Sequence, residues 1–188
     1  MLLDESGKPC GSAPKATVHH ESTPLHLAFS CWLFAEGGTD GTDGTDGAGG
    51  AANHRVLLTQ RAASKRTWPL VWTNSFCGHP APGEPIEDAV RRRGADELGV
   101  SIGAPRLELP DFRYTARMDN GITENEMCPV FTAALTGDPR PEPTEVAAFR
   151  WLDWRALPAE VAADPESYSP WLRLQLPLLL AEAAHRSW

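Results

Sequence analysis

WTNSFCGHPAPGEPIEDAVRRRGADELGV, residues 72–100, is the stretch of sequence around which the rest of this chain is organised. Its first half is rich in turn-forming residues and places the thiol of Cys77 two residues before the imidazole of His79. Its second half predicts a helix, because Pro85 suits the first helical position, apolar residues recur at helical spacing and Gly99 follows as a stop signal. A reactive loop that leads into such a helix can bring a nucleophile, a metal ligand and carboxylates into one cleft.

The size and charge of the chain indicate one domain whose main partner is not a nucleic acid. A chain of 188 residues is long enough to form a single domain with its own core. The 17 Lys and Arg residues are outnumbered by 25 Asp and Glu residues, which gives a formal net charge of −8. Binding to a phosphate backbone requires clustered positive charge, whereas a small phosphorylated ligand requires only a local basic cluster. We therefore expect a single domain over residues 1–188 and a small-molecule partner.

Cysteine usage and hydropathy predict a cytoplasmic protein without a membrane partner. The first ten residues carry acidic groups where a signal peptide would be basic. The apolar run at 176–180 is interrupted by Pro177 and is too short to span a bilayer. The four cysteines are widely spaced, with no CxxC pair, which is typical of a reducing compartment: Cys10, Cys31, Cys77 and Cys128.

Hydrophobic patterning outside the opening stretch predicts an α+β fold with a mixed sheet. The expected strands span residues 2–3, 25–34, 55–61, 107–114, 124–135 and 148–152, with a turn at 119–121. Residues 15–24 are polar and are expected to form a loop. Asp153 is expected to cap a short helix, and Ser169-Pro170 to start a terminal helix that ends near Ala184.

A three-fold Thr-Asp-Gly repeat, GGTDGTDGTDGAGG at residues 37–50, interrupts this pattern. The segment has no apolar side chains to bury, so it predicts a flexible, solvated loop. Aspartates at every third position are compatible with calcium, but the repeat has neither EF-hand spacing nor a closing Glu. Calcium binding is therefore the disfavoured interpretation.

The opening stretch resembles the Nudix box, a loop-helix motif with fixed spacing of Gly, Glu and Arg. The residues that match this spacing are Gly78, Glu84, Arg92, Glu97 and Gly99. The match is degenerate, because Arg93 stands where the box has its first helical Glu and Asp96 replaces the next-to-last Glu.

Three further segments make the resemblance more specific. TNSFCGHP at 73–80 resembles the active-site signature of type I isopentenyl diphosphate isomerases, a Nudix-fold family. LHLAFS at 25–30 is similar to the first strand of that family, and TENEMCPVF at 123–131 to its second signature. The segments occur in the family's order and cover most of the chain from Lys15 to about Trp171. This resemblance implies a Nudix-like α/β/α sandwich with a mixed central sheet.

Imidazoles and carboxylates form the first group of candidate site residues. Glu124 and Glu126 are an i,i+2 pair, which places both carboxylates on one face of a strand. Such ligands suit Zn²⁺, Mn²⁺ or Mg²⁺, although any single histidine is more often an ordinary loop residue. The family's spacing selects His19 over His20 as the upstream ligand. The resemblance implies a divalent metal held by His19, His26, His79, Glu124 and Glu126.

Basic side chains form the second group. Arginine forks suit phosphate oxygens, and lysine adds a mobile positive charge. By matched position, the residues that bind the substrate diphosphate in the family are Lys15, Arg61, Lys65 and Arg93. Glu97 would hold a Mg²⁺ that bridges to the diphosphate. The alternative for the run that includes Lys65 and Arg66 is a solvated charged surface, and we take Arg91 as a surface residue.

The third group would carry the chemistry of moving a carbon–carbon double bond. This reaction adds a proton at one carbon and removes one from another through a carbocation-like state, in a dry pocket with electron-rich walls. The resemblance assigns the proton transfers to Cys77 and Glu126, assistance of Glu126 to Tyr114, and stabilisation of the cation to the ring of Trp171. Their alternatives are a buried free thiol, a structural carboxylate and core aromatics, and Cys128 is the better candidate for a core cysteine.

Taken together, the motifs predict an isomerase that interconverts isopentenyl and dimethylallyl diphosphate in isoprenoid biosynthesis, acting as a monomer or weak dimer. A Nudix hydrolase is the main alternative, and Arg93 in place of a carboxylate speaks against it. A non-catalytic Nudix-fold module would explain the degenerate box but not the set of Cys77, Tyr114 and Glu126. The sequence leaves open which proton transfer belongs to Cys77 and which to Glu126.

Overall fold

The structure, a computed structural model, describes residues 1–35, 55–135 and 137–186. The prediction of a flexible loop at 37–50 lies outside the described residues. Within the described ranges, no helix combines the length and the apolar character needed to cross a membrane.

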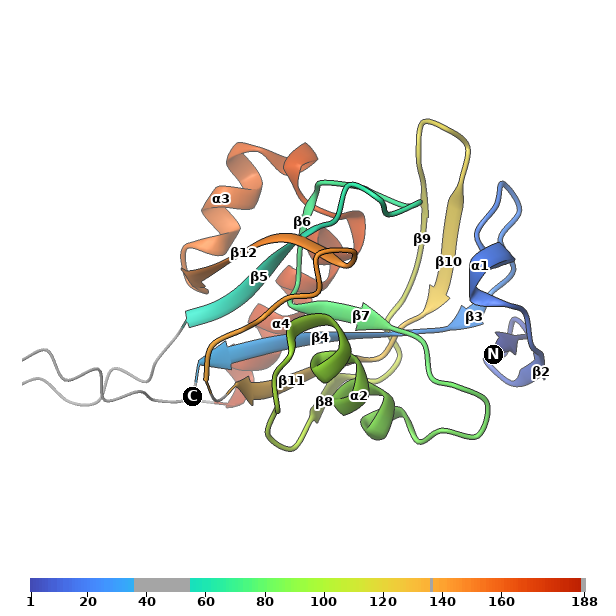
Figure 1. Ribbon diagram of the computed structural model, residues 1–188, viewed down its shortest axis with the longest axis horizontal. Helices are drawn as coiled ribbons and strands as arrows, with labels where there is room; N and C mark the ends of the chain where they lie inside the picture. Colours follow the sequence, from blue (N-terminus) through green and yellow to red (C-terminus); the bar gives the residue numbers. More distant parts are fainter. Residues whose placement is uncertain (36–54, 136, 187–188) are drawn as a thin grey trace, which may run out of the picture.

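In the described part of the chain, two sheets and three helices of seven or more residues form the fold (Figure 1). The smaller sheet has the order β2-β1-β3-β10-β9, and the larger one β12-β5-β4-β11-β8, with β6 paired to β5 and β7 to β4. The strands are β1 (Leu2–Leu3), β2 (Pro9–Gly11), β3 (His26–Leu27), β4 (Phe29–Ala35), β5 (Arg55–Arg61), β6 (Trp72–Thr73), β7 (Phe76–Gly78), β8 (Arg106–Leu109), β9 (Arg113–Arg117), β10 (Thr123–Met127), β11 (Val130–Leu135) and β12 (Val146–Asp153). The helices are α1 (Lys15–Val18), α2 (Ile86–Leu98), α3 (Leu157–Ala163), the 3₁₀ helix η1 (Pro165–Ser167) and α4 (Pro170–Arg186).

The larger sheet is mixed and is covered on both faces. β4 pairs in parallel with β11, whereas its pairing with β5 and β7 is antiparallel. Alternate residues of β4 point to opposite sides: Phe29 and Leu33 join the core beneath α2, and Trp32 joins the core beneath α4. α2 and α4 accordingly lie on opposite sides of this sheet (Figure 1). The arrangement confirms the expected α+β fold with an α/β/α sandwich and a mixed central sheet.

The prediction of single strands at 25–34 and 124–135 was wrong, because each segment divides between the two sheets. The first divides at Ala28, which separates β3 from β4, and the second at Cys128-Pro129, which separates β10 from β11. Pro129 has no N–H with which to continue a ladder. Because β3 pairs with β10 and β4 with β11, the two segments change sheet at the same level. The expected strand at 107–114 divides in the same way into β8 and β9.

Smaller differences concern the ends of elements. Residues 15–24, expected as a loop, begin with the four-residue helix α1. Pro85 precedes α2 as its N-cap and is not its first helical residue. Asp153 ends β12 instead of capping α3; its carboxylate accepts the main-chain N–H of Arg155 at 2.9 Å. The terminal helix begins at Pro170, as expected, and continues to Arg186.

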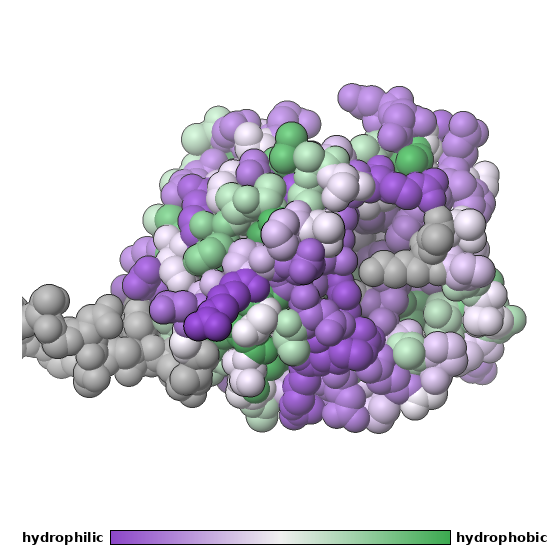
Figure 2. Space-filling model, viewed as in Figure 1, coloured by the Kyte–Doolittle hydropathy of each residue, from purple (hydrophilic) through white to green (hydrophobic). Residues whose placement is uncertain are grey.

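α2 follows the predicted pattern most closely. Its apolar residues Ala89, Val90 and Leu98 are buried against the central sheet, while hydrophilic side chains gather over this part of the surface (Figure 2). The helix ends at Gly99, which has a left-handed φ of 64° and donates its N–H to Ala95 O at 3.0 Å. A Cβ at Gly99 would lie 2.9 Å from the carbonyl oxygen of Arg140.

We expect Gly99→Ala to be more destabilising than Gly83→Ala. Both glycines have positive φ, which costs another residue about 1–2 kcal/mol. Only Gly99 also meets a main-chain atom; around Gly83 no described atom lies within 4 Å of the added Cβ. The clash should add roughly 1 kcal/mol or more to the loss in free energy of unfolding, measured by urea denaturation. Equal losses in the two variants would contradict this account of the helix end.

Candidate active site and metal centre

A cavity of about 500 Å³ opens where the two sheets separate. β7 and the loop after it form one wall, and the strand pair β9–β10 forms another. Most of the predicted site residues line this cavity: His19, Arg61, Lys65, Cys77, His79, Arg93, Glu97, Tyr114, Glu124, Glu126 and Trp171. Of the two remaining residues, His26 is buried beside Glu126, and the side chain of Lys15 is outside the described part of the structure.

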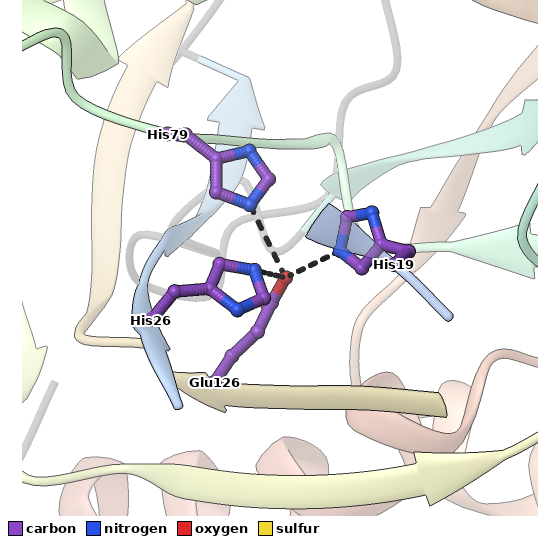
Figure 3. Close-up of side chains that lie close together, drawn as sticks. All are labelled: His19, His26, His79 and Glu126. Atoms are coloured by element: carbon purple, nitrogen blue, oxygen red, sulfur yellow. Dashed lines mark ion pairs between the residues drawn. The ribbon is translucent and has the colours of Figure 1, made fainter. Parts of the chain in front are cut away.

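Three imidazoles surround one carboxylate oxygen at one side of the cavity (Figure 3). The Nε2 atoms of His19, His26 and His79 lie 3.7, 3.3 and 3.3 Å from Oε1 of Glu126. The candidate ligand atoms of these four residues all lie within 4.8 Å of one another. Parallel pairing places His26 of β3 directly beside Glu126 of β10, and the loop after β7 brings His79 to them.

The donor set fits a divalent metal ion. Nδ1 of His26 lies 3.0 Å from Pro24 O, so a proton on Nδ1 leaves the lone pair of Nε2 directed at the cluster. The Nε2 atoms of His19 and His26 are buried and have no hydrogen-bond partner among the described residues. Ligands about 2.1 Å from a tetrahedral ion are about 3.4 Å apart, which is close to the measured separations. The cluster can therefore hold a divalent metal ion.

Electrostatics at the cluster favour a charged Glu126. Burial opposes ionisation, but the neighbouring imidazoles of His19, His26 and His79 outweigh it and hold the pKa of Glu126 well below its ordinary value. Burial lowers the pKa of His26, yet the carboxylate of Glu126, 3.3 Å from its Nε2, leaves that pKa raised overall. A carboxylate that is ionised and surrounded by imidazoles is a suitable metal ligand.

Glu124, the second predicted carboxylate ligand, lies beside this cluster and not within it. The phenol of Tyr114 bridges the two carboxylates, because its Oη donates to Oε2 of Glu124 at 2.7 Å and to Oε2 of Glu126 at 3.0 Å. Burial, together with the charge of Glu126, raises the pKa of Glu124. Burial and the two carboxylates raise the pKa of Tyr114 well above its ordinary value, so the phenol remains a donor. A role for Glu124 as a metal ligand stays a prediction.

Cys77 lies in β7 and lines the cavity. Burial raises the pKa of its thiol to about 12, although a hydrogen bond with Ser30 acts in the opposite direction. Ser30 Oγ lies 3.3 Å from Sγ of Cys77 and 3.4 Å from Sγ of Cys128. Cys128 is buried in the core beneath α4, where the sequence predicted a core cysteine.

Basic residues form a second group in the lining of the cavity, which we call its basic end. Arg93 pairs with Glu97, the last glutamate of α2, and its Nη2 lies 3.5 Å from Oε2 of Glu145. Lys65 also pairs with Glu145. Arg61 donates from Nε and Nη2 to the main-chain carbonyl oxygen of Thr67, at 3.0 and 2.9 Å, and its guanidinium lies 5.3 Å from the ring centroid of Trp171.

Sequence reasoning missed Glu145, because it stands alone immediately before a strand and matches no motif. Only the fold brings it to Lys65 and Arg93, which precede it in the chain by 80 and 52 positions.

His20, which we set aside in favour of His19 on the sequence, is exposed, and its Nδ1 accepts the main-chain N–H of Ser22 at 3.2 Å. Its ring therefore lies outside the cluster.

Comparison with known proteins relates this chain to a domain family and, more specifically, to named relatives. The NUDIX domain family model matches residues 46–172. A curated relative from Leifsonia xyli subsp. xyli, named isopentenyl-diphosphate Delta-isomerase, is 55% identical over 96% of this chain and 90% of its own length. A relative of the same name from Mycolicibacterium vanbaalenii is 50% identical over 99% of this chain and 94% of its own.

Solved structures extend the relationship at the level of the fold. A Deinococcus radiodurans protein superposes with a TM-score of 0.60 and 19% identity, covering 87% of this chain and 88% of that one. A MutT NUDIX hydrolase from Burkholderia pseudomallei has a TM-score of 0.56 and 22% identity, with 82% and 97% covered. At these identities the likeness concerns the fold alone.

We expect His79→Ala to lose metal affinity while His20→Ala retains it. Removal of a ligand should weaken binding by at least the 10–100-fold that is typical of disturbing an outer-shell partner. The measurement is isothermal titration of metal-stripped protein with Mn²⁺ or Zn²⁺, with His20→Ala as the matched control because that imidazole lies outside the cluster. Equal affinity in the two variants would remove His79 from the metal site.

Proposed function

This chain belongs to the NUDIX-domain family and, within it, to the isopentenyl-diphosphate Delta-isomerases, and we propose that its cavity interconverts isopentenyl and dimethylallyl diphosphate. The observation that carries the proposal is that one cavity combines two proton carriers, Cys77 and Glu126, with a metal-type cluster and a basic end. The chain is thus an isomerase of isoprenoid biosynthesis, and the residue roles that follow are our assignment.

The basic end of the cavity is assigned to the diphosphate. Lys65 and Arg93 both form ion pairs with Glu145. Arg61 lines the same cavity, and its guanidinium is held by the main-chain carbonyl oxygens of Thr67 and Trp68. Guanidinium and ammonium groups are suited to phosphate oxygens. Glu97, buried beside Arg93, is assigned to a Mg²⁺ that bridges to the diphosphate, since Mg²⁺ prefers few carboxylates together with phosphate oxygens. Lys15 is assigned to the diphosphate by matched position only.

The hydrocarbon part of the substrate is assigned to the space between Cys77, Glu126 and Trp171. One residue of the pair Cys77 and Glu126 gives a proton to the terminal alkene carbon, and the other takes a proton from the carbon two bonds away. The double bond moves and the formula of the substrate is unchanged. The indole of Trp171, a wall of the cavity, offers its electron-rich face to the positive charge that develops between the two steps.

The cluster of His19, His26, His79 and Glu126 is assigned to a divalent metal, with Zn²⁺, Mn²⁺ or Mg²⁺ as the candidates. A bound ion would fix the orientation of the Glu126 carboxylate and tune its affinity for a proton. Tyr114 donates a hydrogen bond at the other oxygen of Glu126, 3.0 Å away. Glu124, which shares that phenol at 2.7 Å, is kept as a second carboxylate ligand in this proposal.

Hydrolysis of a diphosphate is the less favourable assignment for this cavity. Cleavage in Nudix hydrolases relies on clustered carboxylates that hold several metal ions. Here Arg93 occupies the position of one such carboxylate and pairs with another, Glu97. This places positive charge where a hydrolase would place a metal ion.

We also propose a single domain over residues 1–188 that acts in the cytoplasm as a monomer or weak dimer. Strands β4 and β11 each contribute side chains to both hydrophobic core clusters, one on either face of the larger sheet. This supports one folding unit in the described ranges. All four cysteines are free thiols, which is typical of a reducing compartment.

The reaction itself is tested by incubating the protein with isopentenyl diphosphate in D₂O. We expect deuterium to enter dimethylallyl diphosphate, as followed by proton NMR, without release of phosphate. In the same assay, Cys77→Ser should lower turnover by roughly 10²–10⁴-fold, because the hydroxyl is a far poorer proton carrier at neutral pH.

Cys128→Ser is the matched control for this assay, since that thiol contacts the same Ser30 but lies in the core. It should remain active, with a modest loss of stability. Phosphate release from a nucleoside diphosphate at a comparable rate would favour a hydrolase, and full activity of Cys77→Ser would make the thiol structural.

Glu145→Gln should bind inorganic pyrophosphate more tightly than the unmodified protein. The glutamate pairs with Lys65 and Arg93, so a bound diphosphate has to displace its charge. Partly exposed ion pairs are worth about 0.2–1 kcal/mol, so calorimetry should show a gain in affinity of roughly 1.4- to fivefold. The control is Glu142→Gln, an exposed glutamate that contacts Thr144. Weaker binding together with a higher Mg²⁺ requirement would instead identify Glu145 as a metal ligand.

A further inference from the structure

We propose that Asn74 is a positioning residue whose side-chain carbonyl oxygen holds the thiol of Cys77 and the indole of Trp171 in a fixed relation. The proposal rests on the function assigned above, which gives those two groups separate parts in the reaction. Asn74 is fully buried, with 0% of its surface exposed. Its position just before Cys77 in the chain had given no sign of contact with Trp171, which lies 97 residues further on.

The orientation of the Asn74 amide is determined by its nitrogen. Nδ2 donates to the carbonyl oxygens of Cys31 at 2.9 Å and Phe76 at 2.8 Å, so both of its hydrogens are in use. The opposite orientation would turn the NH₂ group toward the indole N–H of Trp171 and leave two donors facing each other. The oxygen therefore faces the two candidate catalytic groups.

That oxygen accepts hydrogen bonds from both of them. Nε1 of Trp171 donates to Oδ1 of Asn74 at 3.0 Å, and Sγ of Cys77 donates to the same atom at 3.3 Å. Since the indole N–H is donor only, this is the contact that anchors the polar edge of the Trp171 ring. The thiol and the ring thus share one buried atom as their common reference point.

A second side-chain network restrains the sulfur from another direction. Ser30 Oγ lies 3.3 Å from Sγ of Cys77 and accepts a hydrogen bond from Nε2 of Gln175 at 2.8 Å. Oε1 of Gln175 in turn accepts from Nε1 of Trp32 at 2.9 Å, which fixes the Gln175 amide. With Asn74 on one side and Ser30 on the other, the sulfur has little freedom to move away from the cavity.

A positioning role predicts an effect on kcat with little effect on KM. Reacting groups that are displaced by about 1 Å can lose roughly 10²-fold in rate, whereas the diphosphate is bound at the basic end of the cavity. We therefore expect Asn74→Ala to lower kcat by roughly 10–100-fold and to leave KM for isopentenyl diphosphate within a factor of about three.

The matched control is Ser75→Ala, which isolates a purely structural role in the same loop. Ser75 is as buried as Asn74, and its hydroxyl links Leu33 N and Leu57 O, each at 2.7 Å. It does not line the cavity. This variant should lose stability but keep kcat once the folded fraction is taken into account. An equal loss of kcat in Ser75→Ala would show that only the integrity of the loop matters, and would overturn the proposal.

The indole N–H of Trp171 gives a readout that does not depend on activity. In ¹⁵N-tryptophan-labelled protein, its resonance is assigned by its disappearance in Trp171→Phe. We expect Asn74→Ala to shift this resonance upfield and to accelerate its exchange with solvent, because the acceptor is removed, while Ser75→Ala leaves both unchanged. An unchanged indole resonance in Asn74→Ala would overturn the proposal.

Asn74→Asp keeps the proposal testable if Asn74→Ala does not fold. Aspartate retains an acceptor oxygen but loses both donations to Cys31 O and Phe76 O, so it should preserve the indole hydrogen bond at reduced stability. Loss of that bond in Asn74→Asp would contradict the role given to the oxygen. Failure of the unmodified protein to isomerise its substrate would instead contradict the proposed function, since the NMR measurement is independent of turnover.

Discussion

The parallel pairing of β3 with β10 and of β4 with β11 is the constraint on which the rest of the molecule depends. The segment β3–β4 is interrupted at Ala28, and its neighbour β10–β11 is interrupted beside it at Cys128-Pro129. Both segments therefore pass from the smaller sheet to the larger one at the same place. The two sheets separate there, and the cavity opens between them. The same register places His26 beside Glu126, so the strand pairing that makes the opening also supplies the start of the metal-type cluster.

The lining of the cavity brings two kinds of chemistry together. One group is an ionised carboxylate among three imidazoles, and the other is Lys65, Arg93 and the acidic groups that pair with them. Buried charge of this kind costs stability unless it is paired and hydrogen-bonded. The pairing of every such group with a neighbour explains how the fold tolerates them, and it also means that a ligand binds here by exchanging partners.

The degenerate Nudix box gains a physical meaning from this arrangement. The change from Glu to Arg at position 93 turns a metal-binding helix face into one that carries a cation beside Glu97. Gly78 allows this helix to approach β7 closely, because an added Cβ would lie 2.8 Å from Cγ of Arg93 and 2.7 Å from Cζ of Phe29. The loop with Cys77 and the helix with Arg93 are therefore packed as one unit, as their adjacency in sequence led us to expect.

Local patterns in the sequence determined the strand at 55–61, the helix that ends at Gly99 and the start of the last helix at Pro170. These features depend on neighbours a few positions apart, where side-chain periodicity and backbone preferences act directly. The α/β/α sandwich and most of the residues that line the cavity were expected from the resemblance of the motifs to a known family. The tertiary structure alone decided where the long strands change sheet, that Glu145 meets Lys65 and Arg93, and that Asn74 joins Cys77 to Trp171. Periodicity along the chain does not reveal these contacts, because they join residues up to 97 positions apart. They form only when the register of the sheets has placed distant segments side by side.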